Sequence, residues 1–203
     1  MKFEKHVSSL CKKASQKLHA LTRVSCYMNI KQRRVIMNAF IKSQFGYCPL
    51  VWMFHSRSAN NRINIIHERA LRVTYDDYNS TFAELLEKDK SMTIHERNIQ
   101  ALAVELYKVI NGLAIEIMKE IFPLKINTRY PSKFPFQSRN VRTERYGVGT
   151  LSFLGPKIWH LVPDSIKNTT SLIEFKNKIK EWKPINCPCR ICKVYVAELG
   201  FIN

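Results

Sequence analysis

Apolar side chains recur at steps of three and four residues through much of the first 122 positions, which is the spacing of amphipathic helices. The first such segment covers residues 4–25, and its apolar stripe consists of Val7, Leu10, Cys11, Ala14, Leu18 and Leu21. Asn29 is suited to cap a second helix that begins near Lys31, and Ser58 to cap a third that runs to about Thr74. The pattern therefore predicts three helices within the first 75 residues.

Two capping boxes continue the helical pattern. Thr81 with Glu84, and Thr93 with Glu96, place a hydroxyl and a carboxylate three residues apart, where each can accept a hydrogen bond from the other's backbone amide. Asn111-Gly112 is typical of a helix end, because glycine adopts the left-handed conformation without strain. We therefore expect two further helices before residue 123.

The helical periodicity stops at residue 124. Four helix-breaking residues follow, namely Pro131, Pro135, Gly147 and Gly149. We interpret this stretch as an irregular basic loop with a short hairpin around residues 141–153, followed by a helical turn that starts at Gly155-Pro156 and a helix capped by Ser171. The sequence thus predicts a mainly α fold in three parts: a helical bundle (1–122), a basic segment of loop, hairpin and helix (123–183), and a cysteine-containing tail (184–203).

Charge is distributed unevenly along this chain of 203 residues, whose formal net charge is +17. Residues 1–75 contain 14 basic and 2 acidic side chains, residues 76–122 contain 5 and 9, and residues 123–203 contain 14 and 5. Such an excess repels itself unless an anionic partner compensates it. Two basic ends around a mildly acidic middle therefore favour a nucleic acid as the partner, although part of the charge is also explained as a solvated surface.

Several protein classes are excluded. No apolar run reaches the ~18 residues of a membrane-spanning helix, and the N-terminus lacks the apolar core of a secretory signal. Six unevenly spread cysteines do not form a disulfide framework. We expect an intracellular protein of the cytoplasm or nucleus, with reduced thiols, no membrane partner and no small-molecule substrate.

Specific cations are candidates for phosphate contacts. The predicted helices offer Lys12, Lys13, Arg33, Arg34, Arg62, Arg69 and Arg72, and the loop offers Arg139 and Arg142 among aromatic residues. Phosphate contacts position a nucleic acid without reading its sequence, and basic side chains interleaved with aromatic ones can also stack on bases. The alternative for the loop is that its aromatic residues only anchor it to the helices.

Cys187, Cys189 and Cys192 form a C-x-C-x-x-C motif near the end of the sequence. Three thiolates at this spacing can bind one zinc ion, but a structural zinc site needs a fourth ligand. That ligand must come from another segment or another chain. His160 is the nearest earlier candidate, and Cys48, Cys26 and Cys11 are more remote. A redox couple or plain buried thiols are the alternatives.

No catalytic constellation is evident. Asp76 and Asp77 follow Tyr75 directly, in a polar turn rather than on a strand, and no third carboxylate is near them in the sequence for a two-metal site. We interpret the pair as a helix-ending turn or a cap. The six histidines occur singly, and His95 is interpreted as a surface residue beside a helix cap. Glycine-rich phosphate loops and G-x-S-x-G motifs are absent from the sequence.

Several long strings resemble the C-terminal region of jockey-like non-LTR (LINE-type) retrotransposon reverse transcriptases. They cover residues 10–21, 39–41, 43–52, 61–63, 67–72, 154–159 and 187–193, in order along the chain. The resemblance implies a thumb-like bundle and tail that grip a template–primer hybrid and element RNA. The family's catalytic palm and its endonuclease have no counterpart here, so Met1 is expected to be a start inside a longer ancestral reading frame.

The resemblance and the charge pattern lead to one expectation: a fragment of an RNA-directed DNA polymerase that acts as a non-catalytic nucleic-acid clamp. Three alternatives stay open. The chain could be a reverse transcriptase subunit that is active only with a palm from a longer reverse transcriptase. It could be a protein–protein interaction module built on the acidic middle, or a relic without a present role.

Overall fold

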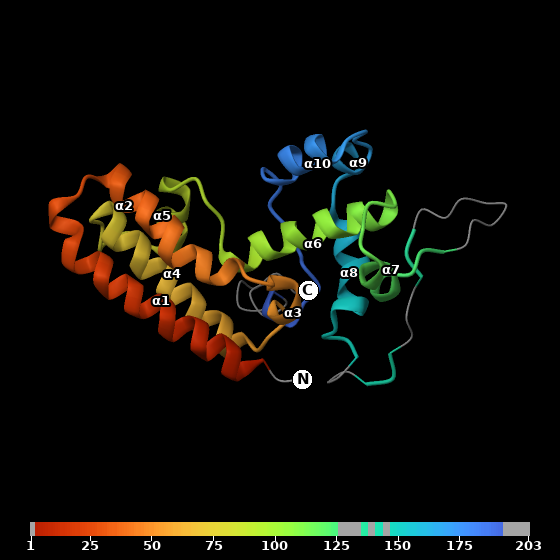
Figure 1. Ribbon diagram of the computed structural model, residues 1–203, viewed down its shortest axis with the longest axis horizontal. Coiled ribbons are helices and arrows are strands. Elements are labelled where there is room, and N and C mark those ends of the chain that lie inside the picture. Colours follow the sequence, from red (N-terminus) through yellow and green to blue (C-terminus); the bar gives the residue numbers. More distant parts are fainter. Residues whose placement is uncertain (1–2, 126–134, 138–140, 144–146, 193–203) are drawn as a thin grey trace, which may run out of the picture. The chain divides into compact units, whose positions relative to one another are not determined.

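The computed structural model describes residues 3–125, 135–137, 141–143 and 147–192 (Figure 1). These residues are mainly helical and include no extended strand, so the predicted mainly α fold is confirmed. The chain divides into two compact units, residues 1–98 and 99–203. The division falls inside helix α6 (Ile94–Ile110), whereas the boundary expected from the sequence lies at residue 122.

The first unit consists of helices joined by short turns. It contains α1 (Glu4–Val24), α2 (Ile30–Ile36), α3 (Pro49–Trp52), α4 (Arg57–Tyr75) and α5 (Phe82–Lys88). A 3-10 turn, η1 (Ser25–Tyr27), links α1 to α2. After α2 the chain continues through a π-helical segment, η2 (Met37–Ile41), and a 3-10 segment, η3 (Lys42–Gly46).

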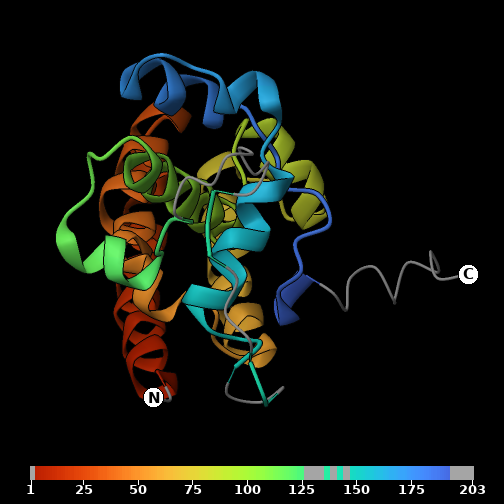
Figure 2. The same ribbon diagram turned by 90° about the vertical axis from the view of Figure 1, so that its right-hand side faces the viewer.

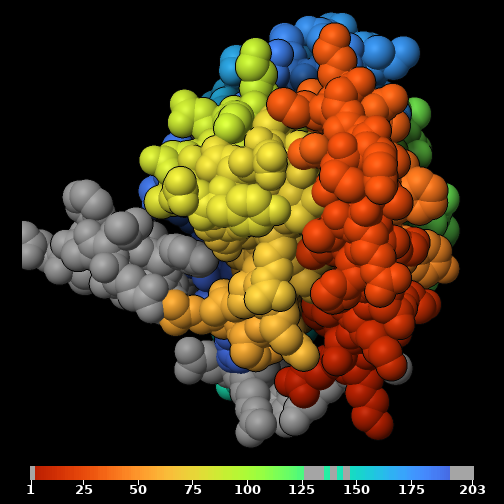
Figure 3. Space-filling model, turned by 90° about the vertical axis from the view of Figure 1, so that its left-hand side faces the viewer, coloured from red at the N-terminus to blue at the C-terminus, as the bar shows by residue number. Residues whose placement is uncertain are grey.

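The core of this unit lies between α1 and α4. The two helices pack side by side on the face shown in Figure 3, where α1 is red and α4 is yellow. All six residues of the apolar stripe predicted on α1 are buried. Ile63, Ala70 and Leu71 of α4 are at most 1% exposed. The helical spacing in the sequence therefore identified the faces that form the core.

Local hydrogen bonds set the helix starts. Asn29 caps α2 as predicted: its side chain accepts from the Gln32 amide, and the Gln32 side chain accepts from the Asn29 amide. Helix α4 starts two residues earlier than predicted, because the hydroxyl of Ser56, rather than that of Ser58, accepts from the Ala59 amide.

The second unit contains most of α6 together with α7 (Glu116–Ile121), α8 (Leu151–Leu161), α9 (Asp164–Lys167) and α10 (Leu172–Ile179). Figure 2 shows α9 and α10 (blue) beyond the C-terminal end of α8 (cyan). An aromatic stack connects these helices. The Phe175 ring lies 4.2 Å from the Tyr107 ring and 6.1 Å from the Trp159 ring, measured between centroids.

The hairpin predicted around residues 141–153 is wrong, because Leu151 begins helix α8. Leu154 and Ile158 lie one helical turn apart and are both buried, so burial of this helical face takes precedence over a strand. An isolated antiparallel bridge instead joins Leu124 to Phe136. Gly155-Pro156 lies inside α8 rather than at its start.

Candidate metal centre and basic surfaces

Four potential metal ligands come together at the start of α6. The ligand atoms of His95, Cys187, Cys189 and Cys192 all lie within 4.8 Å of one another. Three of these residues are buried, and Cys192 is half-buried. The three cysteines predicted as ligands are therefore brought together, and the cluster could hold a metal ion.

Local structure positions His95. It lies in the first turn of α6, which the predicted capping box sets: the Thr93 amide donates to Glu96 Oε2 at 2.8 Å, and the Glu96 amide donates to Thr93 Oγ1 at 3.2 Å. Helix α6 continues without a break into the second unit. There the Gln100 side-chain amide donates to the Trp182 carbonyl oxygen at 2.8 Å, which attaches the chain leading to the cysteines to the same helix.

The thiols of the cluster influence one another strongly. Hydrogen bonding to Cys189, with a further contribution from burial, raises the pKa of Cys187 to about 12. Hydrogen bonds to Cys187 and Cys189, together with burial, also raise the pKa of Cys192. Several thiolates this close together repel one another, and a divalent cation supplies the charge that stabilises them.

The donor set itself indicates the kind of site. Three cysteines and one histidine are a typical four-ligand set of structural metal sites, which are closed. A catalytic zinc site keeps one position for water or substrate, and four protein ligands leave none in tetrahedral coordination. The arrangement therefore suits a structural ion that holds chain segments together.

Four of the predicted phosphate-binding cations are exposed. Lys12 and Lys13 lie on α1 and Arg62 and Arg69 on α4, and no ion pair joins any of them to the part of the chain that the structure describes. Arg62 and Arg69 are seven residues apart, so they lie on the same side of α4 two turns apart. Lys12 and Lys13 are consecutive and point about 100° apart around α1, so they do not share one line.

Two other predicted cations, Arg33 and Arg72, have partners inside the first unit. Arg33 Nε donates to the carbonyl oxygens of Ser25 and Met28 at 2.9 and 3.0 Å, and its Nη1 donates to that of Val73 at 3.3 Å. Arg72 pairs with Glu68 at 2.7 Å. These contacts give both arginines a role in the fold.

Arg34 is one of several donors to the buried carboxylate of Asp89. Its Nε donates to Asp89 Oδ1 at 2.7 Å, Lys42 Nζ donates to Oδ2 at 3.0 Å, and the Tyr75 hydroxyl donates to Oδ1 at 2.8 Å. Arg33 and Arg34 of α2 therefore have partners within the fold, whereas Lys31 of the same helix is exposed. Of the predicted loop residues, Arg142 is exposed and Arg139 lies outside the described residues.

Asp76 and Asp77 end a helix, as predicted. Asp76 adopts the left-handed conformation (φ 53°) at the C-cap of α4. Asp77 accepts hydrogen bonds from the Ser80 amide and hydroxyl and pairs with Lys88 at 2.8 Å. Hydrogen bonds from Lys88 and Ser80 hold the pKa of Asp77 below its ordinary value. This geometry is that of a turn, not of a two-metal centre.

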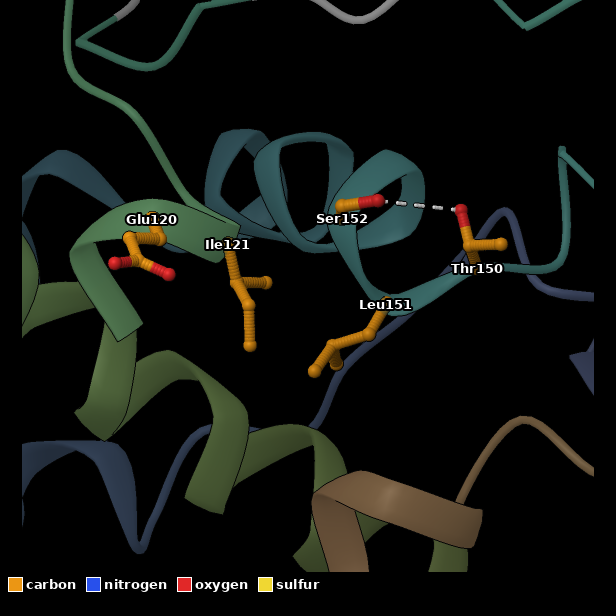
Figure 4. A pocket seen from close by; sticks show the side chains of 5 residues that line it. All are labelled: Glu120, Ile121, Thr150, Leu151 and Ser152. Atoms are coloured by element: carbon orange, nitrogen blue, oxygen red, sulfur yellow. Dashed lines mark hydrogen bonds between the residues drawn. The ribbon is translucent and has the colours of Figure 1, made fainter. Parts of the chain in front are cut away.

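A shallow pocket of about 530 Å³ lies between α7 and the start of α8 in the second unit (Figure 4). Its lining consists of Glu120, Ile121, Thr150, Leu151 and Ser152. The Thr150 hydroxyl donates to the Gly147 carbonyl oxygen at 2.7 Å. The lining contains hydroxyl groups but no histidine or cysteine that would make one of them a nucleophile.

No family model matches this chain, and no curated protein or solved structure does. Among the described helices, none has the length and apolar character required to cross a bilayer. Function must therefore be inferred from the residues themselves.

Sequence reasoning missed His95. The sequence predicts a surface residue at this position, but His95 is only 5% exposed, and the fourth ligand expected from the sequence, His160, is exposed instead. One signal was present: His95 precedes Ile99 by four residues and Leu102 by seven, so it lies on the apolar stripe of α6. A histidine on such a stripe must be satisfied inside the protein.

Proposed function

We propose that this chain binds RNA or an RNA–DNA hybrid through its phosphates, as a non-catalytic clamp. The observation that carries the proposal is the pair Arg62 and Arg69, exposed on one side of α4 without an ion pair to any described residue. Their positions are about 10 Å apart along the helix axis, a separation at which each can reach a different phosphate. Lys12 and Lys13 add positive charge on the neighbouring helix α1.

The proposal agrees with the resemblance to the C-terminal region of jockey-like non-LTR reverse transcriptases. It assigns no catalytic residue to this chain. In that setting the chain is a fragment of an RNA-directed DNA polymerase without its palm, and it positions nucleic acid for, or associates with, a longer reverse transcriptase.

A salt titration tests the clamp. The logarithm of the affinity for an RNA–DNA hybrid should fall linearly with the logarithm of salt concentration, and Arg62→Gln with Arg69→Gln should reduce the slope by roughly two. The matched control is Lys176→Gln with Lys180→Gln, which removes the same charge from exposed positions of the second unit. An unchanged slope in the Arg62/Arg69 variant, with helicity preserved, would contradict the proposal.

We further propose that His95, Cys187, Cys189 and Cys192 hold a structural zinc ion. The mutual proximity of the four ligand atoms and the Cys₃His donor set support this identity. Such an ion attaches the cysteine segment to the first turn of α6. Since unfolded chains rarely contain a preformed site, the binding free energy of the metal also stabilises the fold.

Metal analysis tests the zinc centre. Protein purified without chelator should contain one zinc ion per chain, and Co²⁺ substitution should produce the absorption spectrum of tetrahedral thiolate coordination. His95→Asn and Cys189→Ser should lose the metal and lower the melting temperature, whereas the control His160→Asn should keep it. Failure of the wild-type chain to bind either Zn²⁺ or Co²⁺ would refute the centre.

A further inference from the structure

Apolar and basic side chains lie together on the outside of α2 and η2. Val35 is 67% exposed and Phe40 is 54% exposed. A groove of about 320 Å³ runs along this side of α2, lined by Lys31, Gln32, Val35 and Ile36. We call Lys31, Gln32, Val35 and Phe40 the α2 face. Exposed large side chains gathered in this way are typical of a binding surface.

Part of this face lies on the π-helical segment η2. Lys31 and Val35 are four residues apart, one turn of an α-helix. Phe40 lies in η2, where the Lys42 amide donates to the Met37 carbonyl oxygen five residues earlier, the hydrogen bond of a π-helix. π-Helical turns within α-helices often occur at functional sites.

Helix α1 adds cations beside the aromatic ring. Lys17 Nζ lies 5.9 Å from the centroid of the Phe40 ring. Lys13 precedes Lys17 by four residues, so both lie on the side of α1 that faces η2. An ammonium group next to an exposed ring is where the phosphate attached to a stacked base would be bound.

The stretch of sequence that contains the α2 face is rich in positive charge. Between Glu4 and Glu68 the sequence has no acidic residue and eleven lysines and arginines. A ligand of this face must therefore combine negative charge with flat apolar surface. Single-stranded nucleic acid does so, because its unstacked bases expose their faces, whereas a duplex hides them inside its stack.

We propose that the α2 face binds a single-stranded segment of nucleic acid, with one base stacked on Phe40 and phosphates bound by Lys13, Lys17 and Lys31. The inference rests on the proposed nucleic-acid binding and deepens it by naming the strand state of the ligand. It assigns unpaired strand to α2 and η2, whereas the arginines of α4 bind the backbone of a hybrid.

Fluorescence anisotropy with a labelled oligonucleotide tests the inference on the full chain. The probes are oligo(U), oligo(dT) and an RNA–DNA hybrid of the same length. Phe40→Leu should weaken binding of both single strands about tenfold, since stacking contributes to each bound base, and should leave hybrid binding within about twofold. Phe40→Tyr keeps an aromatic ring and should restore binding. Tyr47→Leu, which removes another exposed ring of the same unit, is the matched control.

A second variant tests the phosphate contacts. Lys17→Gln should reduce the salt slope for single strands by roughly 0.7 and leave the slope for the hybrid unchanged. Arg62→Gln with Arg69→Gln should do the reverse. The two proposals can therefore be distinguished. If the wild-type chain does not bind the hybrid, the proposed clamp is wrong, and the dependence of single-strand binding on Phe40 is still measured separately.

Two results would overturn the inference. One is unchanged single-strand affinity in Phe40→Leu. The other is a Phe40→Leu variant whose nucleic-acid binding is unchanged but whose self-association, or binding to an acidic helical peptide, is altered. Circular dichroism of each variant should show intact helices, as expected for substitutions of side chains that are not buried.

Discussion

Asp89 illustrates how single residues stabilise the first unit. It is 2% exposed and accepts hydrogen bonds from Arg34, Lys42 and Tyr75. Burial alone would raise the pKa of Asp89, but hydrogen bonds from Ser91 and Tyr75 and the charge of Lys42 lower it overall. Burial lowers the pKa of Lys42, and the Asp89 carboxylate opposes that effect. The two charged groups therefore depend on each other.

Loss of the Asp89 charge should destabilise the unit strongly. Asp89→Asn leaves the Lys42 ammonium group buried without its countercharge, so we expect the free energy of unfolding to fall by about 3–5 kcal/mol in urea denaturation. Asp77→Asn, which breaks an exposed pair, should change it far less. Equal effects of the two substitutions would show that the buried cluster contributes no more than a surface pair.

His67 makes stability depend on pH. Burial, together with the charge of Lys42, lowers the pKa of His67 to about 3; Asp89 opposes the shift and Arg97 adds to it. Its ring packs edge-on against Phe82, with centroids 5.5 Å apart. The unfolded chain therefore binds a proton below the ordinary pKa of about 6.5, where the folded chain does not.

Stability should consequently fall as the pH drops from about 6.5 toward 3. From pH 7.5 to pH 5 the contribution of His67 amounts to a loss of about 2 kcal/mol in the free energy of unfolding. His67→Leu should remove that part of the pH dependence, whereas His19→Leu, at an exposed position of α1, should not. Identical pH profiles for His67→Leu and the wild type would rule out this role.

Among the elements, α8 shows why a helix forms against its sequence signals. Gly155 and Pro156 are poor helix residues, yet both lie within α8. A Cβ atom at Gly155 would lie 2.3 Å from Cε1 of Phe122, so the absence of a side chain lets the aromatic ring pack against the helix. Packing within the second unit therefore outweighs helix propensity.

Gly155→Ala should destabilise the second unit although alanine favours helices. We expect a loss of about 1–3 kcal/mol in the free energy of unfolding, because the buried Phe122 ring must move. Gly149→Ala is the control, since no atom lies within 4 Å of its added Cβ. Thermal melts of both variants measure the difference; a more stable Gly155→Ala would mean that Phe122 adapts without strain.

Contacts between residues far apart in the chain determine which cations have partners and which histidine lies beside the cysteines. Among the described cations of the first unit, some have partners within the fold, such as Arg33 and Arg34, and others are exposed without an ion pair to any described residue, such as Arg62 and Arg69. The cysteine cluster acquires its histidine from α6, far earlier in the chain.

The amino-acid sequence predicts helices α1, α2, α4, α5 and α6, and for α1 and α4 it also predicts the faces that are buried. No residue of α2 is buried. Helical spacing and caps such as Asn29 and Thr93 involve residues within one or two turns of each other, so they can be inferred without tertiary contacts. The cysteine motif was evident for the same reason.

Tertiary packing determines which cations have partners within the fold and which histidine lies beside the cysteines. Arg33 bonds to the Val73 carbonyl oxygen and Arg34 to Asp89, and His95 meets Cys187, through contacts between residues far apart in the chain. Local spacing carries no information about such distances, because they arise when apolar helix faces pack together and bring remote polar groups into reach.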